Sequence, residues 1–311
     1  MAATLTTPEI SYRQPDFIYR QADGLSQSQA TEIIKSAAHY QARYGPGAPA
    51  FIPTPNMLVG QATHTGLLEP DDFDSQWASK SDHKSDYTIQ ELKDLLDAAG
   101  TDYKKSAPKA ELMALAFPDG VPVDKRTKLA DKDFDSVRGM VKALRNHDLA
   151  GAWFDPDQPQ YREHNEVSIR VRHPGGQLIK GRLDRVHFDG DRLLILDLKT
   201  TDDAGQGFRR KLVGLSYDLQ AAWYLALAQQ AWPEHSAEFL FCCVERSEPF
   251  GVRLYRAGQS VIDSGRRKMD RALELFSKCN AIDYWPGYSP EVEDLEMPGW
   301  AEQLQDEEAL I

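Results

Sequence analysis

The chain contains few cysteines, and none of them belongs to a metal-binding or redox motif. The three are Cys242, Cys243 and Cys279; two are adjacent, and no pair has the C-x-x-C spacing. This usage is typical of reduced thiols in a cytosolic protein. An iron–sulfur cluster is commonly held by four cysteines, so we expect no cluster of this kind.

Long apolar runs, a leader pattern and a glycine-rich phosphate loop are missing as well. No stretch of about 18 apolar residues is present, which argues against a transmembrane helix. The first residues do not show the basic-then-apolar order of a secretory signal. Without a phosphate-binding loop, the chain is not expected to be an ATP-driven helicase. We therefore expect a cytoplasmic protein that has no membrane partner.

Positive charge is scarce, with 36 lysines and arginines against 48 acidic residues and a formal net charge of −12. Proteins that bind DNA across a broad outer surface are usually basic. An acidic chain can still hold DNA in a groove or channel that is lined by a minority of its charges. Local basic clusters do occur: Lys180, Arg182 and Arg185, followed by Arg209, Arg210 and Lys211. Each of them could equally be an ordinary solvated face.

A β-hairpin is predicted in the middle of the chain. Residues 178–188 alternate in part between apolar and polar, and Asp189-Gly190 is a strong turn dipeptide. Residues 192–198 then form a short, largely apolar strand. This second strand is too apolar to be a solvated edge, so we expect it to lie inside a sheet.

Two acids and a lysine lie on this hairpin. Asp184 is near the end of the first strand, and Asp197 and Lys199 are two apart on the second, so their side chains leave the same face. Two carboxylates that face one point suit Mg²⁺ or Mn²⁺. An ammonium beside them can orient a water or stabilise charge on a phosphate. The alternative is a surface hairpin with solvated charges, and the buried strand and the second acid favour the site.

Three motifs follow one another here: Gly181-Arg-Leu-Asp184, Asp197-Leu-Lys199-Thr200-Thr201 and Gln220-Ala-Ala-Trp-Tyr224. In this order they resemble the PD-(D/E)xK nuclease core, in the variant of exonuclease VIII (RecE) and the wider RecB-like group. That variant carries G-x-x-D, then D-x-K-T-T, then a helix with Q-x-x-x-Y. Leu183 stands where the proline that names the motif would be, as in many RecB-like members.

The resemblance extends to an earlier segment. Gly60-Gln-Ala-Thr-His64 matches the G-x-x-x-H of RecB-like nucleases, and Leu68-Glu69-Pro70 matches the sequence that follows it in RecE-type members. The resemblance implies one or two Mg²⁺ or Mn²⁺ ions in each subunit. The implied ligands are the side chains of His64, Asp184 and Asp197 and the carbonyl of Leu198.

The resemblance also implies roles for other residues. Lys199 would position or deprotonate the attacking water, and Gln220 would hydrogen-bond a phosphate or a ligand carboxylate. Tyr217 or Tyr224 would contact the DNA backbone, although core packing is the alternative for both. Glu166, at the head of a predicted strand, would contact a second metal ion or the water, or would equally be an exposed strand end.

Residues 87–117 interrupt the pattern of the chain. Thr88-Ile-Gln-Glu91 is a capping box that opens one short helix, and Pro108 starts a second. Two short helices around an extended link resemble the SAP/HeH helix–extension–helix module, which often binds nucleic acid. The lysines at the join are Lys104, Lys105 and Lys109. The alternative is a helical hairpin that packs on the core or only spaces it.

The order of the predicted elements gives the fold class and the domain plan. Residues 1–23 look irregular, 25–44 form a helix, and 71–86 look like a linker. Helices over 131–149, 216–232 and 259–281 alternate with strands over 166–172, 238–245 and 251–255. We expect an α/β nuclease core with a mixed central sheet flanked by helices. The segments are 1–86 with His64, the insertion 87–117, the core 118–301 and an acidic tail, 302–311.

Family resemblance implies an exodeoxyribonuclease that digests linear duplex DNA from 5′ to 3′ and leaves a 3′ single strand. It also implies a bacterial host cell, a phage-type recombination role, a single-strand annealing protein as partner and a closed homo-oligomeric ring around the DNA end. Two alternatives stay open. One is a structure-specific or nicking endonuclease on the same core, and the other is a non-catalytic DNA-binding recombination adaptor.

Overall fold

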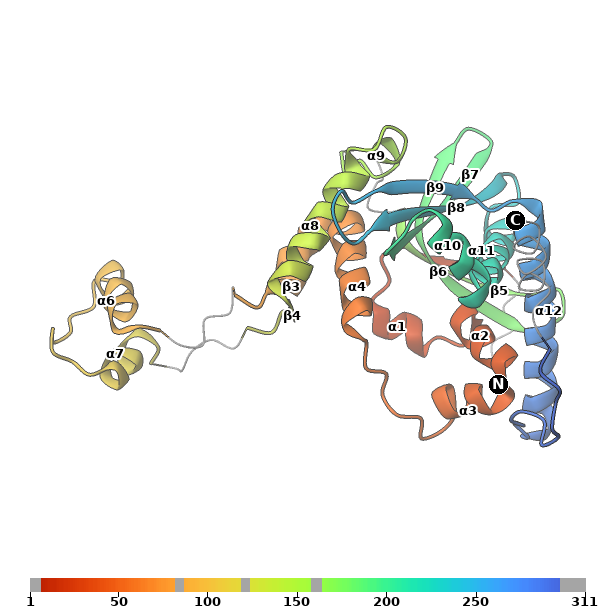
Figure 1. The fold of residues 1–311 in the computed structure, drawn as a ribbon, viewed down its shortest axis with the longest axis horizontal. Helices are drawn as coiled ribbons and strands as arrows, with labels where there is room; N and C mark the ends of the chain where they lie inside the picture. The colour runs from red at the N-terminus through yellow and green to blue at the C-terminus, as the bar shows by residue number, and fades with distance from the viewer. Residues whose placement is uncertain (1–6, 82–86, 119–123, 158–163, 297–311) are drawn as a thin grey trace, which may run out of the picture.

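A mixed seven-stranded sheet is the centre of the computed structural model, which describes residues 7–81, 87–118, 124–157 and 164–296 (Figure 1). Its strand order is β1-β5-β6-β7-β8-β9, and β2 pairs with β6. The pairs β7–β8 and β2–β6 are parallel, and the other neighbours are antiparallel. The strands are β1 (Glu9–Ser11), β2 (Leu25–Ser26), β5 (Asn165–Arg172), β6 (Leu178–Asp189), β7 (Arg192–Thr201), β8 (Ser236–Glu245) and β9 (Val252–Arg256).

The predicted hairpin is confirmed as β6 and β7. Gly190 has φ +59°, the left-handed conformation that a glycine adopts without steric cost at a tight turn. Because side chains alternate along a strand, β7 contributes to both faces of the sheet. Leu193 and Ile195 pack into one hydrophobic core, and Leu194, Leu196 and Leu198 pack into the other.

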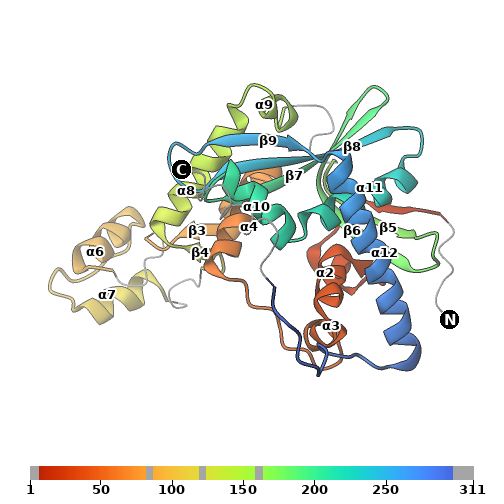
Figure 2. The ribbon, with the colours of Figure 1, turned by 45° about the vertical axis from the view of Figure 1, so that its right-hand side comes forward.

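Helices cover both faces, so the predicted fold class is confirmed. On one face α2 (Gln27–Lys35), α11 (Tyr217–Ala231) and α12 (Gln259–Ile282) pack together. On the other face α4 (Pro55–Leu68) and α8 (Asp131–Arg145) pack against β7 and β8 (Figure 2). Helices α10 (Gln206–Gly214) and α11 form the crossover connection between β7 and β8, so these two strands run parallel. The short α9 (Ala150–Trp153) follows α8.

The N-terminal region is more regular than its sequence indicated. Residues 1–23 were expected to be irregular, but β1 pairs with β5, and α1 (Asp16–Gln21) follows. The single helix expected over 25–44 is wrong, since Ser36 is extended (φ −169°) and separates α2 from α3 (Ala37–Tyr44). The Ser36 hydroxyl accepts a hydrogen bond from the His39 N–H at 3.2 Å, which caps the second helix.

The linker expected over residues 71–86 is also wrong in its first part. Residues 70–76 form α5 (Pro70–Gln76), and β3 (Trp77–Ser79) pairs in parallel with β4 (Thr127–Leu129). A proline at the first position and acids in the first turn favour a helix start even in a polar segment. Phe73 and Trp77 are buried in the core under α4 and α8. Residues 82–86 lie outside the described part.

Two helices, α6 (Ile89–Ala98) and α7 (Lys109–Ala116), form where the insertion was predicted. The capping box is present, because the Thr88 hydroxyl accepts from the Glu91 N–H and the Glu91 carboxylate accepts from the Thr88 N–H. Leu92, Leu96 and Leu112 form a small core of their own with Ala107. Figures 1 and 2 show this pair apart from the sheet. Within the described segments, no helix is long and apolar enough to cross a membrane. The predicted acidic tail lies outside the described residues.

Candidate active site

The site opens where β6 and β7 separate. Their pairing runs as far as Arg185 opposite Leu196, after which β7 continues along β8. Asp184 lies just past this last pair. Its Oδ2 accepts a hydrogen bond from the backbone N–H of Leu198 at 2.8 Å. The side chain thus replaces the backbone partner that a continuous ladder would have supplied, which fixes the carboxylate between the diverging strands.

His64 reaches this carboxylate from α4. Its Nδ1 lies 2.8 Å from the Gly60 carbonyl, one turn earlier, and its Nε2 lies 2.9 Å from Asp184 Oδ2. Carbonyl and carboxylate oxygens only accept, so both contacts need an N–H and the ring is an imidazolium. Burial alone would lower the pKa of His64, but the Asp184 carboxylate raises it to about 9. Residues 120 positions apart therefore meet in one pair.

Asp197 is held by two partners on the same side of the sheet. Its Oδ2 lies 2.6 Å from Lys199 Nζ, and its Oδ1 accepts from Gln220 Nε2 at 2.7 Å. Asp197 is 1% exposed, and this burial raises its pKa to about 6 although the ammonium opposes the shift. The Lys199 ammonium also lies 4.9 Å from the centre of the Tyr217 ring. Residues from β7 and α11 thus converge, as the motif order predicted.

Glu166 faces the same cleft and is not an exposed strand end. It has φ +51°, a left-handed conformation that is strained for a side chain of this size. Its carboxylate lies 4.0 Å from Arg182 Nε. Burial, together with the nearby Asp184 carboxylate, raises the pKa of Glu166 to about 8. A second acid therefore lies near Asp184 in the cleft, on a strained backbone.

These side chains line one cleft of about 980 Å³. Its floor carries His64, Glu166, Asp184 and Lys199, and Asp197 lies buried beneath it. One wall comes from α4 and the other from α10 and the start of α11. A polar cleft of this volume, with acids and an ammonium at its floor, is suited to an anionic polymer that reacts at one position.

The comparisons with known proteins bear on this arrangement. Residues 26–297 match a family described as a PDDEXK-like domain of unknown function, DUF3799. The chain belongs to this family. No curated protein matches it in sequence. A candidate exonuclease from Eubacterium rectale has a similar fold, with a TM-score of 0.55 over 94% of this chain and 98% of that one, at 12% identity.

Family membership confirms the PD-(D/E)xK class that the motifs predicted. The exonuclease VIII subgroup and the SAP/HeH resemblance of the insertion stay predictions, because the family covers a broader class. At 12% identity the likeness to the Eubacterium rectale protein concerns the fold alone.

Nucleases of this class generally use divalent metal ions, and the donors here fit such an ion in kind. They are two carboxylates, an imidazole and the Leu198 carbonyl, an oxygen-rich set. Asp197 Oδ2 is buried and receives no well-directed hydrogen bond. Within the described residues, however, no three His, Cys, Asp or Glu side chains are grouped as metal ligands. His64 and Asp184 bind each other instead, so a cation would compete with the imidazolium proton.

One predicted DNA contact, Arg185, is wrong because its side chain is buried. Arg185 is 2% exposed and donates to Asn165 Oδ1 at 2.7 Å. Tyr224 is partly buried between the core and Gly181, close to Gln220, and its role as a DNA contact stays a prediction; burial raises its pKa well above the usual value. Lys180, in the same local basic cluster, is 6% exposed and donates to the carbonyls of Tyr19 and Arg20.

The other predicted contacts differ in how close they lie to the cleft. Arg182 and Tyr217 line it, and Lys211 lies at its rim. Arg182 donates to the Gln14 carbonyl at 3.0 Å and to Asp16 Oδ1 at 3.2 Å. The remaining cations do not line the cleft: Arg209 and Arg210 are exposed on α10, and Lys104, Lys105 and Lys109 belong to the α6–α7 pair.

Arg246 was not among the predicted residues, although it lines the cleft. It follows β8 directly, and its N–H donates to the Thr201 carbonyl at 2.9 Å. Its position next to Thr201 and Asp202 depends on the parallel pairing of β7 and β8. No local pattern announces that pairing; the helical crossover between the two strands is the one signal that could have indicated it.

Proposed function

We propose that this protein is a divalent-metal-dependent deoxyribonuclease, and more specifically an exonuclease that acts on the ends of linear double-stranded DNA. The observation that supports the proposal is that His64, Asp184 and Lys199 line one cleft, with Asp197 and its partner Gln220 directly behind Lys199. The residues come from four separate elements, α4, β6, β7 and α11, and each is tied to another by a direct polar contact. Ordinary surface charges are not held in this way.

Each residue has a physical role in the proposed reaction. A bound divalent cation would polarise the phosphate and stabilise the charge that develops on it. His64, Asp184, Asp197 and the Leu198 carbonyl would hold that cation. Lys199, fixed by Asp197, orients the attacking water and donates to the phosphate.

Gln220 acts on the reaction through Asp197. By donating to Oδ1 it fixes the rotation of the carboxylate and keeps Oδ2 towards the ammonium. Glu166 lies beside Asp184, where it would contact a water or a second cation. The two acids of the cleft floor thus have different surroundings, which suits them to different roles.

Digestion of an end-labelled linear duplex in Mg²⁺ by the wild type and by Lys199→Ala tests the mechanism. We expect the variant to lose activity by about 10²- to 10³-fold, as when one charge-stabilising donor is removed. Lys278→Ala is the matched control, because Lys278 is an exposed lysine that pairs with Glu274 of its own helix and does not line the cleft. Equal activity of Lys199→Ala and wild type would rule the mechanism out.

The same assay separates the exonuclease from its alternatives. Activity on a closed circular plasmid would indicate an endonuclease, whereas dependence on a free end supports the exonuclease. DNA binding without Mg²⁺ binding in calorimetry would indicate a non-catalytic adaptor. Labels at the 5′ and 3′ ends test the proposed 5′→3′ direction, and the mass of the native particle tests the proposed ring. Co-purification with a single-strand annealing protein tests the proposed partner.

A further inference from the structure

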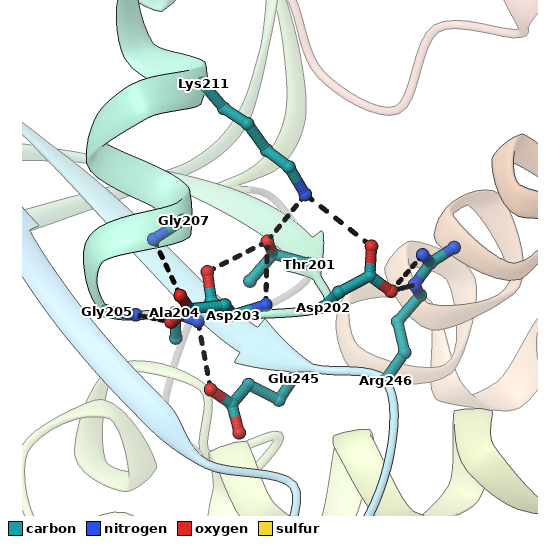
Figure 3. Close-up of polar contacts among 9 residues, drawn as sticks. All are labelled: Thr201, Asp202, Asp203, Ala204, Gly205, Gly207, Lys211, Glu245 and Arg246. Atoms are coloured by element: carbon teal, nitrogen blue, oxygen red, sulfur yellow. Dashed lines mark hydrogen bonds and ion pairs between the residues drawn. The ribbon is translucent and has the colours of Figure 1, made fainter.

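A group of charged residues lies at one rim of the cleft, beyond Lys199. Thr201, Asp202, Lys211 and Arg246 all line this rim. They come from the carboxyl ends of the neighbouring parallel strands β7 and β8 and from α10 (Figure 3). Ligands of open α/β sheets commonly bind at the carboxyl ends of the strands.

Asp202 holds two cations from different elements. Arg246 Nε donates to Asp202 Oδ1 at 3.0 Å, and the Nη2 of the same guanidinium also contacts this oxygen. Lys211 Nζ lies 3.7 Å from the other oxygen, Oδ2, and donates to Thr201 Oγ1 at 3.1 Å. Figure 3 shows the lysine and the arginine reaching the carboxylate from two sides.

The backbone on which these cations sit is fixed without Asp202. The Asp203 carboxylate accepts from the N–H groups of Gly205 at 2.6 Å and Gly207 at 2.7 Å, and so holds the start of α10. A side chain at Gly207 would lie 2.8 Å from Asp203 Cβ, so the cap needs glycine there. Ala204 donates to Glu245 Oε1 at 3.0 Å, which ties the loop to β8. Removing the Asp202 charge should therefore leave the loop in place.

Exposure distinguishes this group from the buried pair below it. The Asp202 side chain is 67% exposed, whereas those of Lys211 and Arg246 are 39% and 24% exposed. An exposed ion pair contributes little free energy in water, so an anion that binds both cations better can displace Asp202. A phosphodiester offers two oxygens to the planar guanidinium fork.

We propose that Arg246 and Lys211 form a phosphate-binding site for the DNA backbone, and that Asp202 holds the two cations until a phosphate replaces it. This inference rests on the proposed nuclease function and deepens it. Thr201 lies two residues beyond Lys199, about 7 Å along the strand. The phosphate bound here would be a neighbour of the one that is cleaved.

Removal of either cation and removal of the Asp202 charge should change DNA binding in opposite directions. If the three residues only stabilised the local structure, all three substitutions would weaken binding. Binding of a fluorescent linear duplex is measured by anisotropy in metal-free buffer over a range of salt. We expect Arg246→Ala and Lys211→Ala each to weaken binding roughly tenfold. Each should also reduce the slope of log affinity against log salt by about 1. Asp202→Asn should bind more tightly than wild type, because both cations are released and a repelling charge is gone.

Arg192→Ala is the matched control. Arg192 also pairs with an acid of the neighbouring strand, Glu238, at 2.9 Å. It lies at the other end of β7, nine residues from Thr201, which is about 30 Å. Its loss changes the net charge as much as the loss of Arg246, so a purely global charge effect would make the two variants equal.

Weaker binding by Asp202→Asn, alongside weaker binding by Arg246→Ala, would show that these residues only stabilise the local structure and would overturn the phosphate site. The phosphate site would also be overturned if Arg246→Ala and Lys211→Ala both kept the affinity and salt slope of the wild type. If the wild type cleaves DNA in that case, the nuclease proposal is unaffected. If the wild type neither binds nor cleaves DNA, both proposals fall. Thermal melting of each variant checks that the fold is kept.

Discussion

Gly181→Ala should disturb the packing of α11 against β6 and thereby the position of Gln220 relative to Asp197. A Cβ at this position would lie 2.5 Å from Leu227 Cδ1 and 3.0 Å from Tyr224 Cε1, both on α11. Leu227 is fully buried, so its methyl group has little space into which it can move. The Trp223 indole donates to the Lys180 carbonyl at 3.0 Å and ties the helix to the strand at this level. The helix must therefore shift or the strand must bend.

The size of the effect follows from this overlap. Adding a methyl group to a closely packed core costs about 1–3 kcal/mol. For a chain of this size that corresponds to a fall in melting temperature of roughly 2–5 °C. Activity should fall by more than the loss of folded protein explains, because Gln220, on the same helix, is hydrogen-bonded to Asp197 at 2.7 Å.

Melting temperature and cleavage of an end-labelled duplex are measured together, the latter at a temperature at which all variants are folded. Gly214→Ala is the control, because among the described residues the Cβ that it adds at the end of α10 meets open space and no other part of the fold. Wild-type melting and activity in Gly181→Ala would refute the reasoning, since α11 would then not depend on a bare backbone at this position.

Three further variants test other parts of the structure. Asp218→Ala should destabilise the protein by about 3 kcal/mol, because Asp218 is 2% exposed and holds Ser264 and Lys268 of α12, each at 2.7 Å; urea unfolding measures this. Ser36→Ala should cost about 1 kcal/mol through the lost cap of α3, whereas Ser36→Asp should retain most of it. His64→Ala should abolish cleavage and the rise in melting temperature that Mg²⁺ gives the wild type, and an unchanged rise would exclude His64 as a ligand.

Much of the sheet could be predicted from the sequence because its signals are local. The Asp189-Gly190 turn and the apolar run 193–196 define the hairpin without reference to the rest of the chain. Ser36 shows the limit of such reasoning. An apolar pattern continues across it, and the only local signal of a new helix start is that serine is a preferred N-cap residue, which here caps α3 through the His39 N–H. The continuous apolar pattern therefore predicted one long helix where the structure has two.

The candidate site could be predicted only in part because charge in a sequence does not tell which way a side chain points. Lys180 and Arg185 lie in one basic cluster with Arg182, yet the first two are buried and bound to carbonyl or amide oxygens. Their partners come from α1 and from the start of β5, and their positions depend on tertiary packing. His64 was predicted through family resemblance, since composition alone favours a structural histidine.

The acidic net charge of the chain is consistent with a cleft whose cations are already paired. Arg182 pairs with Asp16, Arg246 with Asp202, and Lys199 with Asp197. The first two carboxylates are more than half exposed, whereas Asp197 is 1% exposed. In the proposed nuclease, a DNA phosphate would therefore displace the exposed acids at little cost, but not the buried one. This difference would let backbone phosphates bind along the cleft walls while the Asp197–Lys199 pair stays assembled for the reaction.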